Sequence, residues 1–458
     1  MYIKKKFIRA GLSLLLCAFL RLSTNAQLSL SGQFRIRTEF RDGQGTPLPE
    51  TANPAFFISQ RTRLNIGYQM YRLKLGLSVQ DVRVWGQDVS TINRTTTQNN
   101  DGVMLYEAWA EILLTDTTLR NKALSLKIGR QELVYDDQRL IGNLDWLQQG
   151  RRFDAAVLKY ETPAWMIHLA AAYNQNQENN SGTVYNPTPP GNYPASTNGA
   201  SMYKSLEFLY IGKRLNAGKI SFLFFTDQFS KYSVDTVNKI AVKTYQGSTW
   251  SRATTGFYFN NNFGKIGTTA SAYYQFGNSS SGQNLSTILL SGFAQYALTK
   301  KITAGFGIDY TSGGQTGTTS NNFDPLYGTP HKFWGFMDYF YAASPFGKGG
   351  LTDYYIKWRD QLSESSWLTA DFHQFSSAAR IIVPADPSNT GKSFGQEFDL
   401  IYSYNLTKEI NLEGGYGHFW STALLTSPNV KNVPDANPNS NWAYVQINIR
   451  PDFLLKKL

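Results

Sequence analysis

Arginines recur at alternate positions near the beginning of the chain. Arg35 and Arg37 are two residues apart, and so are Arg61 and Arg63. The planar guanidinium group recognises a carboxylate through two parallel hydrogen bonds, a geometry that the lysine ammonium does not offer. Arginines that share one face of a strand therefore predict a cationic surface for carboxylates and other anions.

A second group of charges lies between residues 129 and 154, where basic and acidic side chains are interleaved. It consists of Arg130, Glu132, Asp136, Asp137, Arg139, Asp145, Arg151, Arg152 and Asp154. Because the basic and acidic groups nearly balance, they predict a salt-bridged network that pins residues 134–151 at the mouth of a larger structure. A second interpretation, compatible with the first, is that Arg130, Arg139 and Arg152 face a passing solute.

The elements that position these charges are predicted to be β-strands, because polar and apolar residues alternate in segments of about ten residues. In residues 33–41, Gln, Arg and Glu fall on one face and Phe, Ile and Thr on the other. No apolar run after residue 26 approaches the ~20 residues of a membrane helix. This pattern is typical of a transmembrane β-barrel that is apolar outside and polar inside.

Short connections alternate strictly with long polar connections, as in a barrel with short periplasmic turns and long outer loops. The short connections are expected at 70–71, 115–122, 161–164, 215–218, 263–264, 299–300, 361–364 and 406–407. The long connections are expected at 42–55, 86–102, 134–151, 175–202, 230–248, 278–284, 312–348, 378–391 and 422–440. We therefore predict an all-β fold in which residues 27–458 form a single transmembrane antiparallel β-barrel of 18 strands.

The aromatic-rich segment 331–342 would add a nineteenth strand and leave one terminus outside the cell. Bacterial barrels generally have an even number of strands. The segment is therefore assigned to the 312–348 connection, as a folded loop element or an inward-folded constriction.

Residues 1–26 read as a Sec-type secretory signal. Basic residues precede an apolar stretch from Gly11 to Leu20, and small side chains at Thr24 and Ala26 indicate cleavage near Ala26. The chain is therefore expected in the outer membrane of a Gram-negative cell, surrounded by the lipid bilayer. The net charge is +11, of which five charges lie in the signal, so the excess in the mature barrel is expected to attract anions and not nucleic acid.

An arginine that faces lipid at mid-depth would cost ~2–4 kcal/mol, so the strand cations are assigned to the lumen wall. The residues predicted to line the solute path and set its selectivity are Arg35, Arg37, Arg61, Arg63, Lys74, Lys127, Arg130, Arg139 and Arg152. Acidic residues predicted on the same wall are Glu39, Glu107, Glu111, Glu397, Asp399 and Glu413. Leu126 and Ile128 face outward, so alternation would place Arg130 in lipid, and the strand is expected to end or bulge there.

Residues 129–154 resemble the signature of the alginate-export family of outer-membrane porins. The matching positions are 129–131, 136–137, 139–142, 145–146 and 151–154. Residues 323–333 and 335–338 also look like segments of this family. The resemblance covers essentially the whole mature chain and implies a porin barrel, and the family's founding member exports a polyuronate through an arginine-rich constriction.

The chain departs from the family pattern in two respects: its C-terminus lacks a terminal aromatic residue, and no segment reads as a periplasmic plug between strands. The resemblance therefore implies an anionic or sugar-like solute in general and does not single out alginate.

Three functions remain open on these grounds. The first is an anion-selective outer-membrane channel for oligosaccharides, uronates or organic acids. The second is a loop-plugged barrel that serves as a binding or secretion component beside periplasmic transport proteins. The third is a rim hydrolase built on Asp371 and His373 or on Asp136 and Asp137. We expect no enzyme, cofactor or metal site, because the sequence carries no HExxH, paired-cysteine or phosphate-loop motif.

Overall fold

The computed structural model describes residues 27–86, 103–116, 118, 121–174, 197–198, 201–237, 240–340, 349–381 and 391–457. The predicted signal and its cleavage near Ala26 lie outside these residues. The long strands are β1 (Gln27–Asp42), β2 (Ala55–Met70), β3 (Leu73–Val84), β4 (Met104–Leu113), β5 (Ala123–Gln131), β6 (Phe153–Glu161), β7 (Trp165–Tyr173), β10 (Ser205–Arg214), β11 (Gly218–Val237), β12 (Ile240–Phe263), β13 (Ile266–Asn278), β14 (Asn284–Ala297), β15 (Ile302–Thr311), β18 (Leu351–Asp360), β19 (Ser366–Ser376), β20 (Ser393–Asn405), β21 (Ile410–Ser421), β22 (Asn439–Ile449) and β23 (Asp452–Lys457).

The connections between these strands contain only short elements. They are β8 (Thr197–Asn198), β9 (Ser201–Met202), β16 (Gln315–Thr316), β17 (Thr319–Ser320), the 3-10 helix η3 (Pro330–Lys332) and the helix α2 (Ala423–Thr426). No helix within the described ranges is long and apolar enough to span a membrane.

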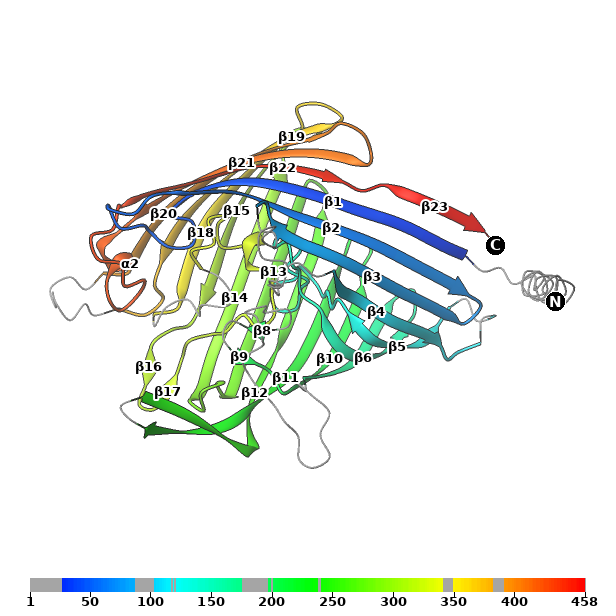
Figure 1. The fold of residues 1–458 in the computed structure, drawn as a ribbon, viewed down its shortest axis with the longest axis horizontal. Coiled ribbons are helices and arrows are strands. Elements are labelled where there is room, and N and C mark those ends of the chain that lie inside the picture. The colour runs from blue at the N-terminus through cyan, green and yellow to red at the C-terminus, as the bar shows by residue number, and fades with distance from the viewer. Residues whose placement is uncertain are drawn as a thin grey trace, which may run out of the picture.

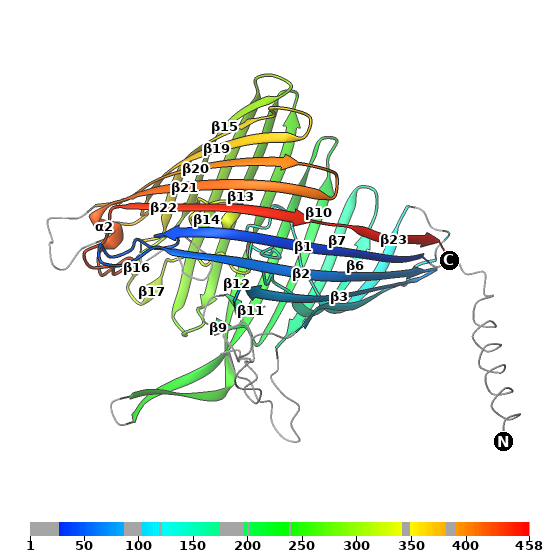
Figure 2. The same cartoon turned by 45° about the horizontal axis from the view of Figure 1, so that its top comes forward.

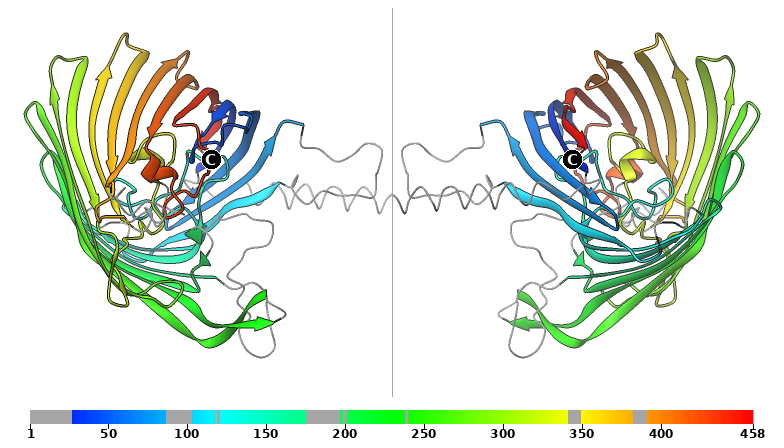
Figure 3. Two further views of the ribbon diagram at one scale, coloured as in Figure 1. Left: turned by 90° about the vertical axis from the view of Figure 1, so that its left-hand side faces the viewer. Right: turned by 90° about the vertical axis from the view of Figure 1, so that its right-hand side faces the viewer.

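The long strands close into an antiparallel barrel (Figures 1 and 3). Each strand pairs with its neighbours in chain order, β7 pairs with β10, and β15 pairs with β18. The seam is formed by β1, which pairs with β2 on one side and with β22 and β23 on the other. Since β22 and β23 are two halves of one strand, separated at Pro451, the predicted 18-strand barrel is confirmed.

The first and last described residues, Gln27 and Lys457, pair with each other at one end of the barrel (Figure 1). The expected connection 230–248 is wrong, because β11 and β12 continue as a hairpin that projects beyond the barrel (Figure 2). Its residues are polar enough to resemble a loop, but Tyr232 pairs with Tyr245 and their rings meet edge to face at 5.8 Å.

Alternation of the strand residues separates the two barrel faces. On β1, Arg35, Arg37 and Glu39 are buried on the inner face. On the outer face, apolar side chains such as Ile356 and Val445 are exposed, at 55% and 63%. An outer apolar band and an inner polar wall are the arrangement that a membrane barrel requires.

Large inward-facing aromatic rings lie flat against glycines of the neighbouring strand. The Tyr355 ring occupies the space that a Cβ of Gly307 would fill, and the Tyr444 ring does the same at Gly415. A substituted residue at either glycine would push the ring into the lumen. The glycines therefore let aromatic side chains line the wall without narrowing it.

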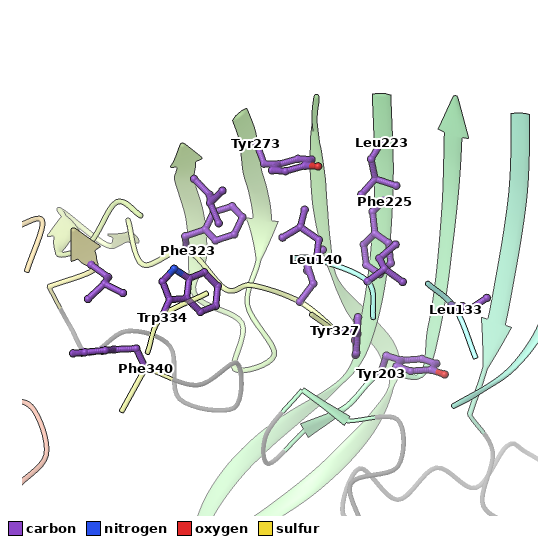
Figure 4. Packing of buried hydrophobic residues seen from close by; sticks show 14 of the residues in the cluster. Leu133, Leu140, Tyr203, Leu223, Phe225, Tyr273, Phe323, Tyr327, Trp334 and Phe340 are labelled. Atoms are coloured by element: carbon purple, nitrogen blue, oxygen red, sulfur yellow. The ribbon is translucent and has the colours of Figure 1, made fainter. Parts of the chain in front are cut away.

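A hydrophobic core fills part of the barrel interior. Figure 4 shows Phe323, Tyr327 and Trp334 from the connection before β18 in one buried cluster with the strand residues Leu223 and Phe225, and Tyr327 lies beside Phe225. All five side chains are at most 4% exposed. The barrel interior is therefore partly filled, and the side chains that fill it come largely from the outer loops.

Candidate functional site: a lumen constricted by two infolded loops

Two outer connections fold into the barrel and meet there. We name residues 132–152 loop A and residues 321–340 loop B. The Tyr327 amide donates to the Leu140 carbonyl at 2.9 Å, and the Gly142 amide donates to the Tyr327 carbonyl at 2.9 Å. The two loops thus share a short parallel backbone pairing across the lumen. A Cβ at Gly328 would collide with the Arg139 carbonyl, which explains the glycine at this crossing.

Arg35 on β1 binds the backbone of loop A through its whole guanidinium group. Its Nη1 donates to the Asp145 carbonyl at 2.8 Å, and its Nη2 donates to the carbonyls of Trp146 and Leu147 at 3.3 and 3.1 Å. Its Nε donates to Gln148 Oε1 at 2.9 Å. A loop inside a barrel has no sheet partner, so a side chain with five donors satisfies its carbonyls.

Arg37 and His331 both contact the indole of Trp146. The Arg37 guanidinium carbon lies 4.0 Å from one ring centroid of Trp146, and the His331 ring stacks on Trp146 at 4.1 Å and 10°. His331 belongs to loop B and pairs with Asp338 of the same loop at 2.9 Å. This stack therefore connects the wall, loop A and loop B in one contact.

Arg61 on β2 holds the carboxylate of Asp145. Its Nη2 lies 2.7 Å from Asp145 Oδ1, while Arg35 Nη1 lies 3.6 Å from Asp145 Oδ2. Arg61 is fully buried, whereas the Asp145 side chain is 43% exposed. Burial acts to raise the pKa of Asp145, but the charges of Arg61 and Arg35 outweigh it and lower that pKa to about 2.

The other end of loop A is anchored on the opposite wall. Arg139 Nη1 donates to Asp309 Oδ2 on β15 at 2.6 Å, and Arg139 Nε lies 3.5 Å from Asp137 Oδ2. Burial lowers the pKa of Arg139, but the two carboxylates outweigh it and raise that pKa. Asp136 accepts hydrogen bonds from Tyr210 and Ser221, each at 2.9 Å. Loop A therefore crosses the lumen from β1–β2 to β10–β15.

Loop B begins on a buried ion-pair cluster at β11 and β12. Arg252 donates to Asp227 Oδ1 at 2.9 Å and to Asp324 Oδ2 at 2.7 Å. The Tyr327 hydroxyl donates to Asp227 Oδ2 at 2.9 Å, and Gln275 exchanges two hydrogen bonds with the Asp324 backbone. Residues 324–327 of loop B are thus held by Arg252, Asp227 and Gln275 of the barrel wall.

The far end of loop B docks on β20 through its backbone amides. The Met337 amide donates to Glu397 Oε1 at 2.8 Å, and the Phe336 amide donates to Asp399 Oδ2 at 3.1 Å. Gly335 has a φ of 79°, and a Cβ there would collide with the Glu397 carboxylate. The expected inward-folded constriction at 331–342 is present over the described residues 331–340.

Several predicted path residues are buried beneath these loops. Arg35, Arg37 and Arg61 are at most 3% exposed, because loop A covers them. The prediction that these three side chains face the solute is therefore wrong. Arg63 donates to Gln80 Oε1 at 2.8 Å and lies 3.5 Å from the Tyr106 ring. Arg139 is likewise buried and serves as an anchor for loop A.

Water-accessible cations of the lumen wall and loops are mostly lysines. Lys74 is exposed, and Lys127 lies 4.0 Å from the Trp109 ring on the inner wall. Lys332 of loop B is exposed, and Lys219 and Lys357 keep 25% and 28% of their side chains exposed. The prediction did not include the last three residues, although Lys219 and Lys357 lie on the polar faces of their strands.

Arg130 and Asp154 lie on the outer face, so their assignment to the solute path and the loop network is wrong. Each occupies an outward position beside a buried inward neighbour, Gln131 or Phe153, and they are direct partners in the register of β5 and β6. Arg130 binds both Asp154 oxygens at 2.8 Å. The strand ends one residue later, at Gln131, and the adjacent carboxylate neutralises the cation.

The remaining loop charges find partners outside the predicted set. Glu132 accepts a hydrogen bond from Tyr106, and Asp136 pairs with Lys219 at 2.9 Å. Arg151 donates to the Gly328 carbonyl at 2.7 Å, and Arg152 contacts Met104 Sδ at 3.7 Å. Of the predicted pairings among these charges, those of Asp137 with Arg139 and of Arg130 with Asp154 are found in the described residues. The loop is therefore pinned, but by wall residues and loop B.

The residues proposed for a rim hydrolase serve structural contacts. His373 Nδ1 lies 2.9 Å from Asp353 Oδ2, and His373 is 1% exposed. Asp371 instead pairs with Lys357 at 2.6 Å. Asp371 and His373 therefore do not form the pair that the hydrolase alternative would use, because each has a partner on β18.

Comparisons with known proteins agree with this geometry. Residues 26–185 match the sequence model of the alginate export family. The matched residues include β1, β2 and all of loop A, so the resemblance expected from residues 129–154 is confirmed there, whereas loop B lies outside the match. No curated protein sequence matches the chain.

Solved structures of outer-membrane porins share the fold. OccK9 (OpdG) of Pseudomonas aeruginosa matches with a TM-score of 0.59 at 13% identity, over 93% of this chain and 98% of that one. OccAB2 of Acinetobacter baumannii matches at 0.58 and 12%, over 93% and 98%. A BenF-like porin of Pseudomonas fluorescens matches at 0.58 and 9%, over 93% and 99%. The chain thus has the barrel fold of an outer-membrane porin.

Proposed function

We propose that this chain forms an outer-membrane channel that passes small hydrophilic solutes and favours anionic or sugar-like ones, such as oligosaccharides, uronates and organic acids. The observation that carries this proposal is the pair of infolded loops, which narrow an 18-strand barrel and are anchored on its inner wall. A barrel of this size otherwise leaves a wide aqueous channel, and a constriction inside it sets selectivity.

Anion preference is supported by the cations that water reaches. Lys74, Lys219, Lys332 and Lys357 are exposed or half-buried within the lumen. In a confined space with low-dielectric walls, such charges raise the local concentration of the opposite ion. The lysines are therefore expected to attract anions toward the constriction that loops A and B form.

Planar-bilayer recording of the purified full-length barrel tests this function. We expect ohmic conductance, with a reversal potential in a potassium chloride gradient that indicates chloride preference. Replacing Lys74 and Lys332 with Gln should reduce that preference without changing the fold. An absence of conductance, or a clear cation preference, would contradict the proposal.

A second candidate function is a loop-plugged barrel that acts as a binding or secretion component with periplasmic partners. It is favoured by the complete burial of the Tyr327 and Trp334 side chains inside the lumen. Replacing residues 329–340 with a short Gly-Ser linker distinguishes the two functions. Conductance that appears only after this replacement supports the plugged barrel, whereas conductance in the parent supports the channel.

A further inference from the structure

We propose that Asp145 is a built-in competitor for carboxylate solutes. Its carboxylate occupies the position on Arg61 and Arg35 that the carboxylate of an entering uronate or organic acid would take. The inference rests on the proposed function, since it assumes that anionic solutes enter the lumen. It names the residue that limits how tightly the channel holds them.

The accessibility of the three side chains supports an exchangeable contact. Asp145 is 43% exposed, whereas Arg61 and Arg35 are 0% and 3% exposed. Water therefore reaches the anion of this ion pair and not its cations. A solute carboxylate can approach the arginines only through the place that the Asp145 side chain now fills.

The hydrogen bonds of Arg61 are incomplete with Asp145 as its ligand. Arg61 Nη2 donates to Asp145 Oδ1 and to Gln33 Oε1, each at 2.7 Å, and Asp145 Oδ2 lies 3.6 Å from Arg35 instead of completing a bidentate pair with Arg61. Within the described residues, Arg61 Nε is buried without a hydrogen-bond partner. A freely oriented carboxylate can engage Nε and Nη2 together, which is the stronger geometry.

Displacement of Asp145 does not require loop A to unfold. The backbone carbonyls of residues 145–147 remain bound to Arg35, and Arg37 also holds the Trp146 carbonyl at 2.9 Å. Only the side-chain dihedral angles of Asp145 need to change. Lys332 of loop B is exposed, and the charges of Asp137 and Asp145 act on it.

The test compares Asp145→Asn with the parent in planar bilayers, using sodium glucuronate as the probe and glucose as a neutral reference. Neutralising the competitor should lower the glucuronate concentration that half-blocks the chloride current about tenfold, as expected if Asp145 occupies about nine-tenths of the sites. The chloride preference should also rise. The effect of glucose should not change.

Two further variants make the result decisive. Asp154→Asn removes the same charge on the outer face, where it should leave the block unchanged. Asp145→Ser removes the carboxylate with a smaller side chain and should reproduce the effect of Asp145→Asn. Asp145 lies in a loop, so neither of the two Asp145 variants disturbs strand pairing.

If the parent conducts anions but both Asp145 variants keep the half-blocking glucuronate concentration of the parent, the proposal that Asp145 competes with solutes is excluded, while the channel function stands. If the parent does not conduct, both proposals fail.

Discussion

The two sides of the lumen hold the infolded loops with opposite chemistry. On β1 and β2, Arg35 and Arg61 donate hydrogen bonds to carbonyl oxygens of loop A. On β20, Glu397 and Asp399 accept hydrogen bonds from amides of loop B. We call the first side the basic half-wall and the second, together with Asp309 on β15, the acidic half-wall.

This difference shows how a polar barrel wall replaces a missing sheet partner. A backbone segment within the lumen carries both donors and acceptors, and each must be satisfied when water is excluded. The basic half-wall satisfies the acceptors of one loop and the acidic half-wall satisfies the donors of the other. Charged side chains on a lumen wall therefore position loops, besides any effect on solutes.

Arg139→Met should have the largest effect, because Arg139 ties loop A to the acidic half-wall. The variant leaves Asp309, which is 2% exposed, without its cation, at a cost of about 3–5 kcal/mol. We expect larger, noisier conductance and protease cleavage within residues 132–152. Adding Asp309→Leu should restore the parent behaviour, because it removes the unpaired charge. An unchanged digestion pattern in the single variant would break the comparison.

Lys431, between β21 and β22, is a cation that clamps carbonyl oxygens next to the acidic half-wall. Its Nζ donates to the Gly45 and Tyr339 carbonyls, and burial lowers its pKa from 10.5 to about 8. Between pH 8 and pH 10.5, Lys431 is therefore protonated in the unfolded segment but largely neutral in the folded one. The free energy of unfolding of this segment should rise across that range by about 3 kcal/mol. Hydrogen exchange of residues 422–438 should slow over this window beyond the intrinsic pH effect. Lys431→Met should abolish the dependence.

Gly335→Ala tests the acidic half-wall alone. The new Cβ would meet the Glu397 carboxylate at a φ of 79°, which should weaken the docking of loop B by about 1–3 kcal/mol. Gly264→Ala is the matched control, because its φ is 63° but no atom lies within 4 Å of the added Cβ. Increased open-channel noise in the first variant only is the expected result. Equal behaviour of the two variants would mean that Gly335 carries no docking role.

Asp154→Asn should have the smallest effect. Its pair with Arg130 lies outside the lumen with side chains 37% and 51% exposed, so its loss should cost under about 1 kcal/mol. Conductance, protease resistance and the thermal transition should match those of the parent. A protease-sensitive loop A in this variant would restore the earlier expectation that Asp154 pins it.

The strand layout could be predicted from the sequence because its signal is local. Alternation assigns each residue to one face, and barrel closure then fixes the parity of the count. The same rules placed Arg35 and Arg61 on the inner wall correctly. They failed at residues 230–248, where polar composition concealed a hairpin that continues beyond the barrel.

The loop contacts could not be predicted because their partners are distant in sequence. Arg139 and Asp309 are 170 residues apart, and Arg35 and Asp145 are 110 apart. The near-balance of charge within residues 129–154 predicted pairing inside this segment. In the structure, several of these charges pair instead with strand residues, such as Arg139 with Asp309 and Asp136 with Lys219. Arg130 could not be placed from alternation alone, because its outward position depends on its register partner Asp154, whose carboxylate neutralises it.

The seam between β1 and the final strand has a kinetic consequence. Neighbouring barrel strands otherwise follow one another in the chain, whereas the seam joins residues such as Gln33 and Asn448, which are 415 positions apart. Loop-closure entropy makes such a pairing the slowest to form. Sequential hairpin addition should therefore precede seam closure. We expect the interruption at Pro451 to divide that last event into two steps, in which β22 pairs with β1 separately from the six residues of β23.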